Sequence, residues 1–134
     1  MEAPATSPSG TRSLFATILI YWMPVLLYIT MIVVVSAQAN LTPPLKFRNA
    51  DKLFHVAEYF VLGLLLARAA FASLRGRDVL KPALLALALG LAVGAGDEYF
   101  QSFIPGRDSN PVDWLADTMG VTIAQIGFLM FSRD

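Results

Sequence analysis

Four long apolar stretches dominate the chain, and each has about the length that a helix needs to cross a membrane. The first stretch runs from Leu14 to Ala37 without a charged residue. The second runs from Leu53 to about Leu74, the third from Pro82 to Ile104 and the fourth from Val112 to Phe131. Because a spanning helix needs about 20 mostly apolar residues, the pattern predicts an all-α, polytopic membrane protein with a four-helix transmembrane bundle.

Short polar segments separate these stretches and show where helices begin. Pro82 suits the first turn of the third helix, where the missing N–H of a proline is not needed. Asn110 is a candidate cap for the fourth helix, and Pro111 suits its first helical position. The opening residues are rich in Ala, Pro, Ser and Thr. They predict a disordered tail over residues 1–12, followed by a single membrane domain over residues 13–134.

The first stretch has some features of a cleaved signal peptide. Arg12 precedes it, and Ala37-Gln38-Ala39 matches the small-residue pattern of a cleavage site. However, the apolar core of a signal peptide has about 7–15 residues, and this stretch is much longer. We therefore expect the segment to be retained as the first membrane helix rather than removed by cleavage after Ala39.

The composition agrees with a membrane protein and excludes other classes. The 134-residue chain is 56% hydrophobic and 15% charged, and its mean hydropathy is +0.59, whereas about 25% of the residues of an average soluble domain are charged. The formal net charge is zero, so nothing attracts the chain to nucleic acid. The absence of cysteine excludes disulfides and thiolate-bound zinc.

The distribution of Lys and Arg between the loops predicts the orientation in the membrane. With four spans, the two termini and the second loop lie on the same side. That side carries six basic residues: Arg12, Arg68, Arg75, Arg77, Lys81 and Arg133. The other side carries four: Lys46, Arg48, Lys52 and Arg107. The excess predicts that both termini are cytoplasmic.

Ionisable residues occur mainly at one end of the second, third and fourth stretches, and an antiparallel helix order brings those ends to one membrane face. Charge at the edge of the hydrocarbon layer is costly and therefore indicates a functional site. The candidate catalytic residues are His55, Glu58, Asp97 and Asp117. The candidate ligand-binding residues are Asp51, Lys52, Glu98, Gln101, Arg107 and Asp113.

Polar and small residues share one stripe on each of these three helices, at about 100° per residue. From the second helix to the fourth, the stripes are Asp51, His55, Glu58 and Leu62; Gly90, Gly94, Asp97 and Gln101; and Asp113, Asp117, Gly120, Ala124 and Gly127. Small residues let helix backbones approach closely in a membrane. The stripes should therefore face the interior of the bundle and bring His55, Asp97 and Asp117 into one polar pocket.

Several of these residues also have structural interpretations. Asp51 would interact favourably with the helix dipole in a first turn, and Asp113 would fit a variant capping box with Asn110. Glu98 lies at the edge of its stripe, where a salt bridge with Arg107 would stiffen the following turn.

Other site residues are harder to explain by structure alone. His55 could bond Asp51 or Tyr59, or act as a metal ligand or proton shuttle. Glu58 and Asp117 lie deeper in their helices and have no capping role. Acids outnumber bases on this face, so a divalent metal or a cationic ligand group could supply the missing charge. The sequence specifies no metal and no cofactor.

Three motifs in this region match a known family in content and order. They are Asp51-Lys52-x2-His55-x3-Tyr59-x2-Leu62-Gly63, then Asp97-Glu98-x2-Gln101-x-Phe103-x-Pro105-Gly106-Arg107, then Asp113-x3-Asp117-x2-Gly120. The chain thereby resembles the VanZ-like family of small bacterial membrane proteins, whose founding member is associated with resistance to the glycopeptide teicoplanin. The resemblance implies several helices in the bacterial inner membrane. The family usually has Asn at the position of Asp117, so this chain carries an additional carboxylate there.

Three functional hypotheses are compatible with these patterns. In the first, the charged face binds or processes an amphiphile that enters from the membrane, such as a lipid-linked cell-wall intermediate or an acylated glycopeptide. His55 or Glu58 would then handle protons, and Arg107 would hold an anionic group.

In the second hypothesis, the charges form an ion-pair network in a non-catalytic partner protein. In the third, they serve proton- or cation-coupled transport, which would require a homo-oligomer because four helices leave little wall around a pathway. The chain has no nucleophile elbow, P-loop or HExxH motif, so no reaction class is indicated and its status as an enzyme stays open.

Overall fold

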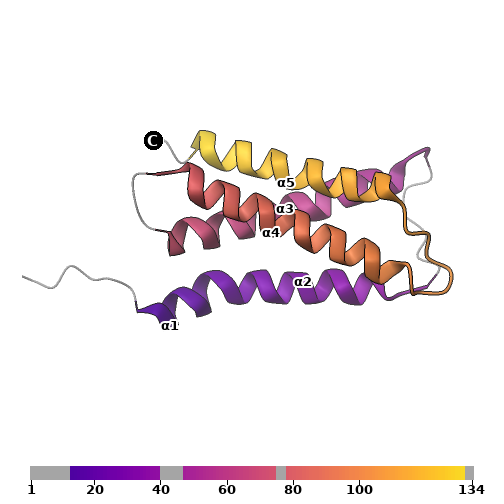
Figure 1. Ribbon diagram of the computed structural model, residues 1–134, viewed down its shortest axis with the longest axis horizontal. Coiled ribbons are helices and arrows are strands. Elements are labelled where there is room, and N and C mark those ends of the chain that lie inside the picture. The colour runs from indigo at the N-terminus through magenta and orange to yellow at the C-terminus, as the bar shows by residue number, and fades with distance from the viewer. Residues whose placement is uncertain (1–12, 40–46, 75–77, 132–134) are drawn as a thin grey trace, which may run out of the picture.

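Four long antiparallel helices make up the computed structural model, which describes residues 13–39, 47–74 and 78–131 (Figure 1). The elements are α1 (Leu14–Thr17), η1 (Ile18–Trp22), α2 (Met23–Ser36), α3 (Ala50–Ser73), α4 (Leu80–Gln101) and α5 (Pro111–Phe131). The first three follow one another without a break and form the first rod. No strand occurs in the described ranges, so the predicted all-α four-helix bundle is confirmed. The tail predicted over residues 1–12 lies outside the described residues.

Local sequence explains how the first and last rods begin. The Ser13 side chain caps α1 by accepting a hydrogen bond from the backbone N–H of Ala16 at 3.2 Å. The π-helical turn η1 ends two residues before Pro24, which has no backbone N–H to donate to the residue four positions earlier. At the start of α5, Asn110 Oδ1 accepts from the backbone N–H of Val112 at 3.0 Å, and Pro111 is the first helical residue. The predicted cap and proline position are therefore confirmed.

The predicted limits of the second and third helices were displaced. Helix α3 begins at Ala50 rather than Leu53, and α4 runs from Leu80 to Gln101 rather than from Pro82 to Ile104. Apolar content marks the part of a helix that lies in hydrocarbon, but a helix can continue with polar residues where water is available. Asp51 and Lys52 thus lie in the first turn of α3, as the stripe and helix-dipole interpretations of Asp51 predicted.

The four rods differ in how deeply they are packed. Each is long and apolar enough to cross a membrane, by length and composition. In an 18-residue apolar segment of each rod, the buried share is 33–39% for α3, α4 and α5, but only 11% for the first rod. The last three helices thus form the packed centre, and α2 lies beside them at the bottom of Figure 1.

Glycines allow the three central helices to pack backbone against backbone. A Cβ added at Gly120 of α5 would lie 2.3 Å from the backbone oxygen of Val56 in α3. A Cβ at Gly63 would lie 2.7 Å from Ala124 Cβ, and one at Gly90 would lie 2.7 Å from a methyl carbon of Val121. By contrast, nothing lies within 4 Å of a Cβ at Gly127, so the predicted inclusion of Gly127 in the packed stripe was wrong.

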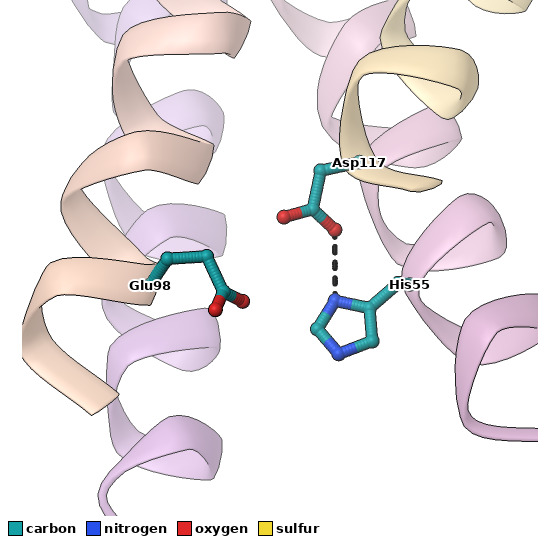
Figure 2. Close-up of side chains that lie close together, drawn as sticks. All are labelled: His55, Glu98 and Asp117. Atoms are coloured by element: carbon teal, nitrogen blue, oxygen red, sulfur yellow. Dashed lines mark hydrogen bonds and ion pairs between the residues drawn. The ribbon is translucent and has the colours of Figure 1, made fainter. Parts of the chain in front are cut away.

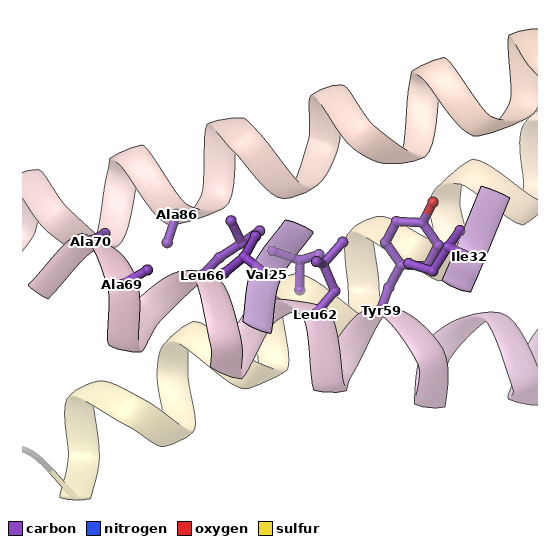
Figure 3. Close-up of a cluster of buried hydrophobic side chains, with 9 residues drawn as sticks. Val25, Ile32, Tyr59, Leu62, Leu66, Ala69, Ala70 and Ala86 are labelled. Carbon is purple, nitrogen blue, oxygen red and sulfur yellow. The ribbon is translucent and has the colours of Figure 1, made fainter. Parts of the chain in front are cut away.

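The apolar core follows α3 along the bundle (Figure 3). Its fully buried side chains are Val25 and Ile32 from α2, Tyr59, Leu62, Leu66, Ala69 and Ala70 from α3, Ala86 from α4 and Val121 from α5. Small alanines in the half beyond Leu66 and larger side chains nearer Tyr59 fill the space between the helices. This core holds the polar ends of α3, α4 and α5 at fixed positions.

Candidate functional site

The ionisable ends of three helices meet at one end of the bundle. The end of α2, the start of α3, the end of α4 and the start of α5 all lie on the right of Figure 1. The turn between α4 and α5 is tight, and Gly106 within it adopts a left-handed φ of 84°, which a glycine takes readily. The convergence predicted from the antiparallel helix order is therefore confirmed.

Lys52 links α3 to α5 at the outer layer of this site. Its ammonium group lies 2.8 Å from Asp51 Oδ2 and also contacts Asp113 Oδ1. Asp113 is buried, and its carboxylate pairs with Lys52 instead of closing a capping box. Lys52 is thus an internal counter-ion for two site carboxylates, whereas the capping interpretation of the Asp113 side chain was wrong.

His55 joins α3 to α5 one layer deeper. Its Nδ1 lies 2.8 Å from Asp117 Oδ1, and its Nε2 lies 4.0 Å from Asp113 Oδ2 (Figure 2). The sequence suggested Asp51 or Tyr59 as partners on the same helix, and that expectation was wrong. Asp117 is almost completely buried, so this contact orients the imidazole inside the protein.

Glu98 extends toward His55 and Asp117 from α4 (Figure 2). The three side chains offer one ligand atom each, and these atoms all lie within 4.8 Å of one another. Glu98 Oε2 accepts a hydrogen bond from the backbone N–H of Asn110 at 3.0 Å. Ser109 Oγ lies 2.9 Å from the Glu98 backbone oxygen and 3.3 Å from Glu98 Oε2. Glu98 Oε1 is buried and has no hydrogen-bond partner among the described residues. Glu98 is therefore a central residue of the cluster and not an edge residue.

Arg107 does not form the predicted salt bridge with Glu98. Across the described ranges, no carboxylate lies within ion-pair distance of Arg107. Arg107 is half-buried, and its Nε lacks a hydrogen-bond partner there. The backbone carbonyl of Ile104, which accepts from the Arg107 N–H at 3.1 Å, fixes the turn instead. The guanidinium thus stays available to another group.

Asp97 points to a different neighbour from Glu98. Its Oδ2 accepts hydrogen bonds at 2.8 Å from both Ser36 Oγ and Gln101 Nε2, and Gln101 Nε2 also lies 3.3 Å from Ser36 Oγ. These three buried side chains attach α4 to the end of α2. Ser36 is a site residue that helical periodicity did not predict, although its hydroxyl lies at the end of an apolar span on the same membrane face.

Glu58 and Tyr59 are the polar residues of α3 that lie next to the cluster on its deeper side. The Glu58 side chain is half-buried, and within the described chain it forms no ion pair; its backbone oxygen accepts from Tyr28 OH at 3.1 Å. The Tyr59 hydroxyl is buried without a hydrogen-bond partner among the described residues. Both groups border the cluster but do not bond to its members.

The cluster contains more acids than its basic residues neutralise. In the described parts of the chain, Lys52 is the only Lys or Arg within 4.0 Å of a site carboxylate, and it pairs with Asp51 and Asp113. No Lys or Arg in these parts pairs with Glu58, Asp97 or Glu98. An isolated buried charge costs much free energy unless it is paired or neutralised. The site therefore requires protons or an added cation.

The fold and this cluster define a multi-pass membrane protein with a buried, charged site at one end of its bundle. The family model for VanZ/LLP1 matches residues 6–132, which is nearly the whole chain. The chain therefore belongs to the VanZ/LLP1 family, and the predicted resemblance is confirmed. No curated protein and no solved structure matches the chain.

Proposed function

We propose that this protein binds the polar head group of an amphiphile at the charged end of the bundle, on the non-cytoplasmic face of the bacterial inner membrane. The observation that carries the proposal is a set of buried polar atoms without hydrogen-bond partners among the described residues: Asp97 Oδ1, Glu98 Oε1, Asp117 Oδ2 and Arg107 Nε. Buried polar groups in proteins are nearly always satisfied. A head group with both donors and acceptors would satisfy these.

The two signs of charge in the site suit a zwitterionic or mixed head group. Glu98 and Asp117 would accept hydrogen bonds from an amine, or contact a cation that the head group binds. Arg107 would hold a carboxylate or phosphate, which its planar guanidinium can grip with two hydrogen bonds. His55, held by Asp117, would accept or release a proton as the head group enters.

The surface beside the site suits the apolar tail of the same molecule. Tyr99 and Phe103 are 71% and 64% exposed at the end of α4, and their rings meet edge to face at 5.0 Å between centroids. Aromatic side chains are common where a membrane protein meets the boundary between lipid and water. A bound amphiphile would keep its tail in the lipid against these rings while its head reaches the charged cluster.

The ligand class that unites these features is an acylated or lipid-linked cell-envelope molecule. Lipid-linked cell-wall intermediates and acylated glycopeptides of the teicoplanin type both combine charged groups with an apolar chain. The family resemblance adds weight to the glycopeptide, since its founding member is associated with teicoplanin resistance. Capture of either molecule at the membrane face would lower the exposure of the cell wall to the antibiotic.

The test compares two arginine-to-lysine variants in a teicoplanin-sensitive host. Arg107→Lys keeps the charge but loses the two-point grip, so resistance should fall to near the level of cells without the protein. Arg68→Lys is the matched control, because Arg68 lies on a later turn of α3, away from the charged end. Its guanidinium carbon lies 4.9 Å from the centroid of the Tyr21 ring. Equal resistance of Arg107→Lys and wild type, at matched membrane levels, would remove Arg107 from head-group binding.

A second candidate function is that of a non-catalytic partner protein held together by its charges. The bridge from Lys52 to Asp51 and Asp113 favours it, because this bridge needs no ligand to join α3 to α5. A purely structural network should tolerate the exchange Lys52→Asp with Asp113→Lys. If the exchanged protein confers full resistance, the structural role explains this layer of the site, and if resistance is lost in a folded protein, ligand binding explains it.

A further inference from the structure

We infer that His55, Glu98 and Asp117 bind one divalent transition-metal ion between α3, α4 and α5. The inference concerns the site of the proposed function and rests on it for the biological use of the ion, but the metal chemistry stands on separate observations. The ion would supply the positive charge that the site lacks and would present open coordination positions to an oxygen of the head group.

The first observation is the spacing of the three side chains. One ligand atom from each lies within 4.8 Å of the others, and Figure 2 shows all three directed toward a common space from three different helices. His55 Nδ1 and Asp117 Oδ1 are 2.8 Å apart. Two ligand atoms that each lie about 2.0–2.2 Å from a tetrahedral ion are about 3.3–3.6 Å apart. This hydrogen-bonded pair therefore needs to open by only about 0.5–0.8 Å to hold an ion between its atoms. Glu98 needs only a small approach to become the third ligand.

The second observation is independent of that spacing and concerns unsatisfied oxygens. Glu98 is 8% exposed and Asp117 is 1% exposed, yet Glu98 Oε1 and Asp117 Oδ2 have no hydrogen-bond partner among the described residues. Figure 2 shows these two carboxylates on facing helices, with His55 beside them. A cation between them would satisfy both oxygens and offset their mutual repulsion.

The surroundings keep this space open and orient the ligands. A Cβ added at Gly94 would lie 3.3 Å from Asp117 Oδ2, so the glycine keeps the oxygen free of a neighbouring side chain. The backbone N–H of Asn110 holds Glu98 by its other oxygen, and Ser109 Oγ bonds the Glu98 backbone oxygen at 2.9 Å. Such outer contacts commonly fix the direction of metal-binding carboxylates.

The ligand chemistry selects the class of metal. One imidazole and two carboxylates suit Zn²⁺ or Mn²⁺, whereas Mg²⁺ and Ca²⁺ prefer sites made only of oxygen. The chain has no cysteine, so no thiolate competes for the ion. Three protein ligands leave at least one coordination position open.

The experiment measures Zn²⁺ bound to the full chain in lipid nanodiscs, after chelator treatment and dialysis, by elemental mass spectrometry. Wild type should bind about one Zn²⁺ per chain. Glu98→Gln should weaken binding about 10–100-fold or more, since even loss of an outer-shell partner costs that much. Asp78→Asn is the matched control: it makes the same carboxylate-to-amide change just before the start of α4, at the opposite end of the bundle, and should bind as wild type does.

A second pair of measurements keeps the inference falsifiable if Glu98→Gln does not fold. Asp117→Asn, nearly equal in size, should also lose Zn²⁺, and excess Mg²⁺ should not displace Zn²⁺ from wild type. Binding by wild type no tighter than by the folded ligand variants would overturn the inference. So would an equal loss in Asp78→Asn, or displacement of Zn²⁺ by excess Mg²⁺.

The outcome separates the metal from the amphiphile. Zn²⁺ binding without retention of an amphiphile would leave the metal site standing and contradict the proposed function. Retention of an amphiphile by metal-free wild type, with no Zn²⁺ taken up on addition, would contradict only the metal inference.

Discussion

Gly120→Ala should destabilise the bundle and disturb the site, although it adds only one methyl group. The new Cβ would lie 2.3 Å from Val56 O, 2.8 Å from Phe60 N and 3.1 Å from Tyr59 C, and all three are backbone atoms of α3. Restoring ordinary contact at 3.4 Å requires α3 and α5 to separate by about 1 Å. Overpacking of this kind costs about 1–3 kcal/mol, because backbone cannot rotate away as a side chain can.

Gly127→Ala, on the same helix, is the matched control. Nothing lies within 4 Å of its added Cβ, and alanine is about 0.5–1 kcal/mol better than glycine in a helix interior. Unfolding of the two variants by a denaturing detergent, with wild type beside them, gives the free-energy differences. Gly120→Ala should be less stable than wild type and Gly127→Ala at least as stable. Equal stability of the two variants would refute the close α3–α5 packing on which the site geometry depends.

Three further predictions concern the polar layers and the orientation. Ser36→Ala should lower the free energy of unfolding by about 1–3 kcal/mol in the same assay, because buried Asp97 loses a donor. Thr30→Ala should have little effect, because the Thr30 hydroxyl bonds only Leu26 O within its own helix. Equal effects of the two variants would argue against the α2–α4 contact. Lys52→Met should destabilise by about 1–3 kcal/mol because buried Asp113 loses its cation, and an unchanged free energy would show that the pair is not formed. A C-terminal alkaline phosphatase fusion should be inactive and a green fluorescent protein fusion bright, while an active phosphatase would reverse the predicted orientation.

The number and type of the helices followed directly from the sequence, because apolar length and capping residues act locally. Asn110 and Pro111 marked the start of α5 through contacts within one turn. The convergence of the charged ends also followed, since it needs only four antiparallel spans. By contrast, the starts of α3 and α4 could not be read from apolar content, because helices continue beyond the hydrocarbon layer. The end of α4 could not be read either, because Phe103 and Ile104 are apolar but form turns with i→i+3 backbone hydrogen bonds.

The partners of individual site residues could not be predicted, because periodicity places a residue on its own helix but does not give the rotation of neighbouring helices. Asp97 and Glu98 are adjacent and point about 100° apart; both are buried, one against Ser36 of α2 and the other toward His55 of α3. The periodicity of α4 predicted that Asp97 faces inward and that Glu98 lies at the edge of the stripe. Both directions are interior only because α2, in the first rod, packs against the side of α4 that carries Asp97.

Retention of an amphiphile by the purified protein tests the central claim most directly. Native mass spectrometry of the full chain, released from nanodiscs made with cell-envelope lipids and supplied with teicoplanin, would detect a bound molecule and identify it by mass. The account predicts a one-to-one complex with wild type and with Arg68→Lys, and its loss in Arg107→Lys. No complex with wild type, or equal occupancy in all three proteins, would contradict the claim that the charged end of the bundle binds a polar head group.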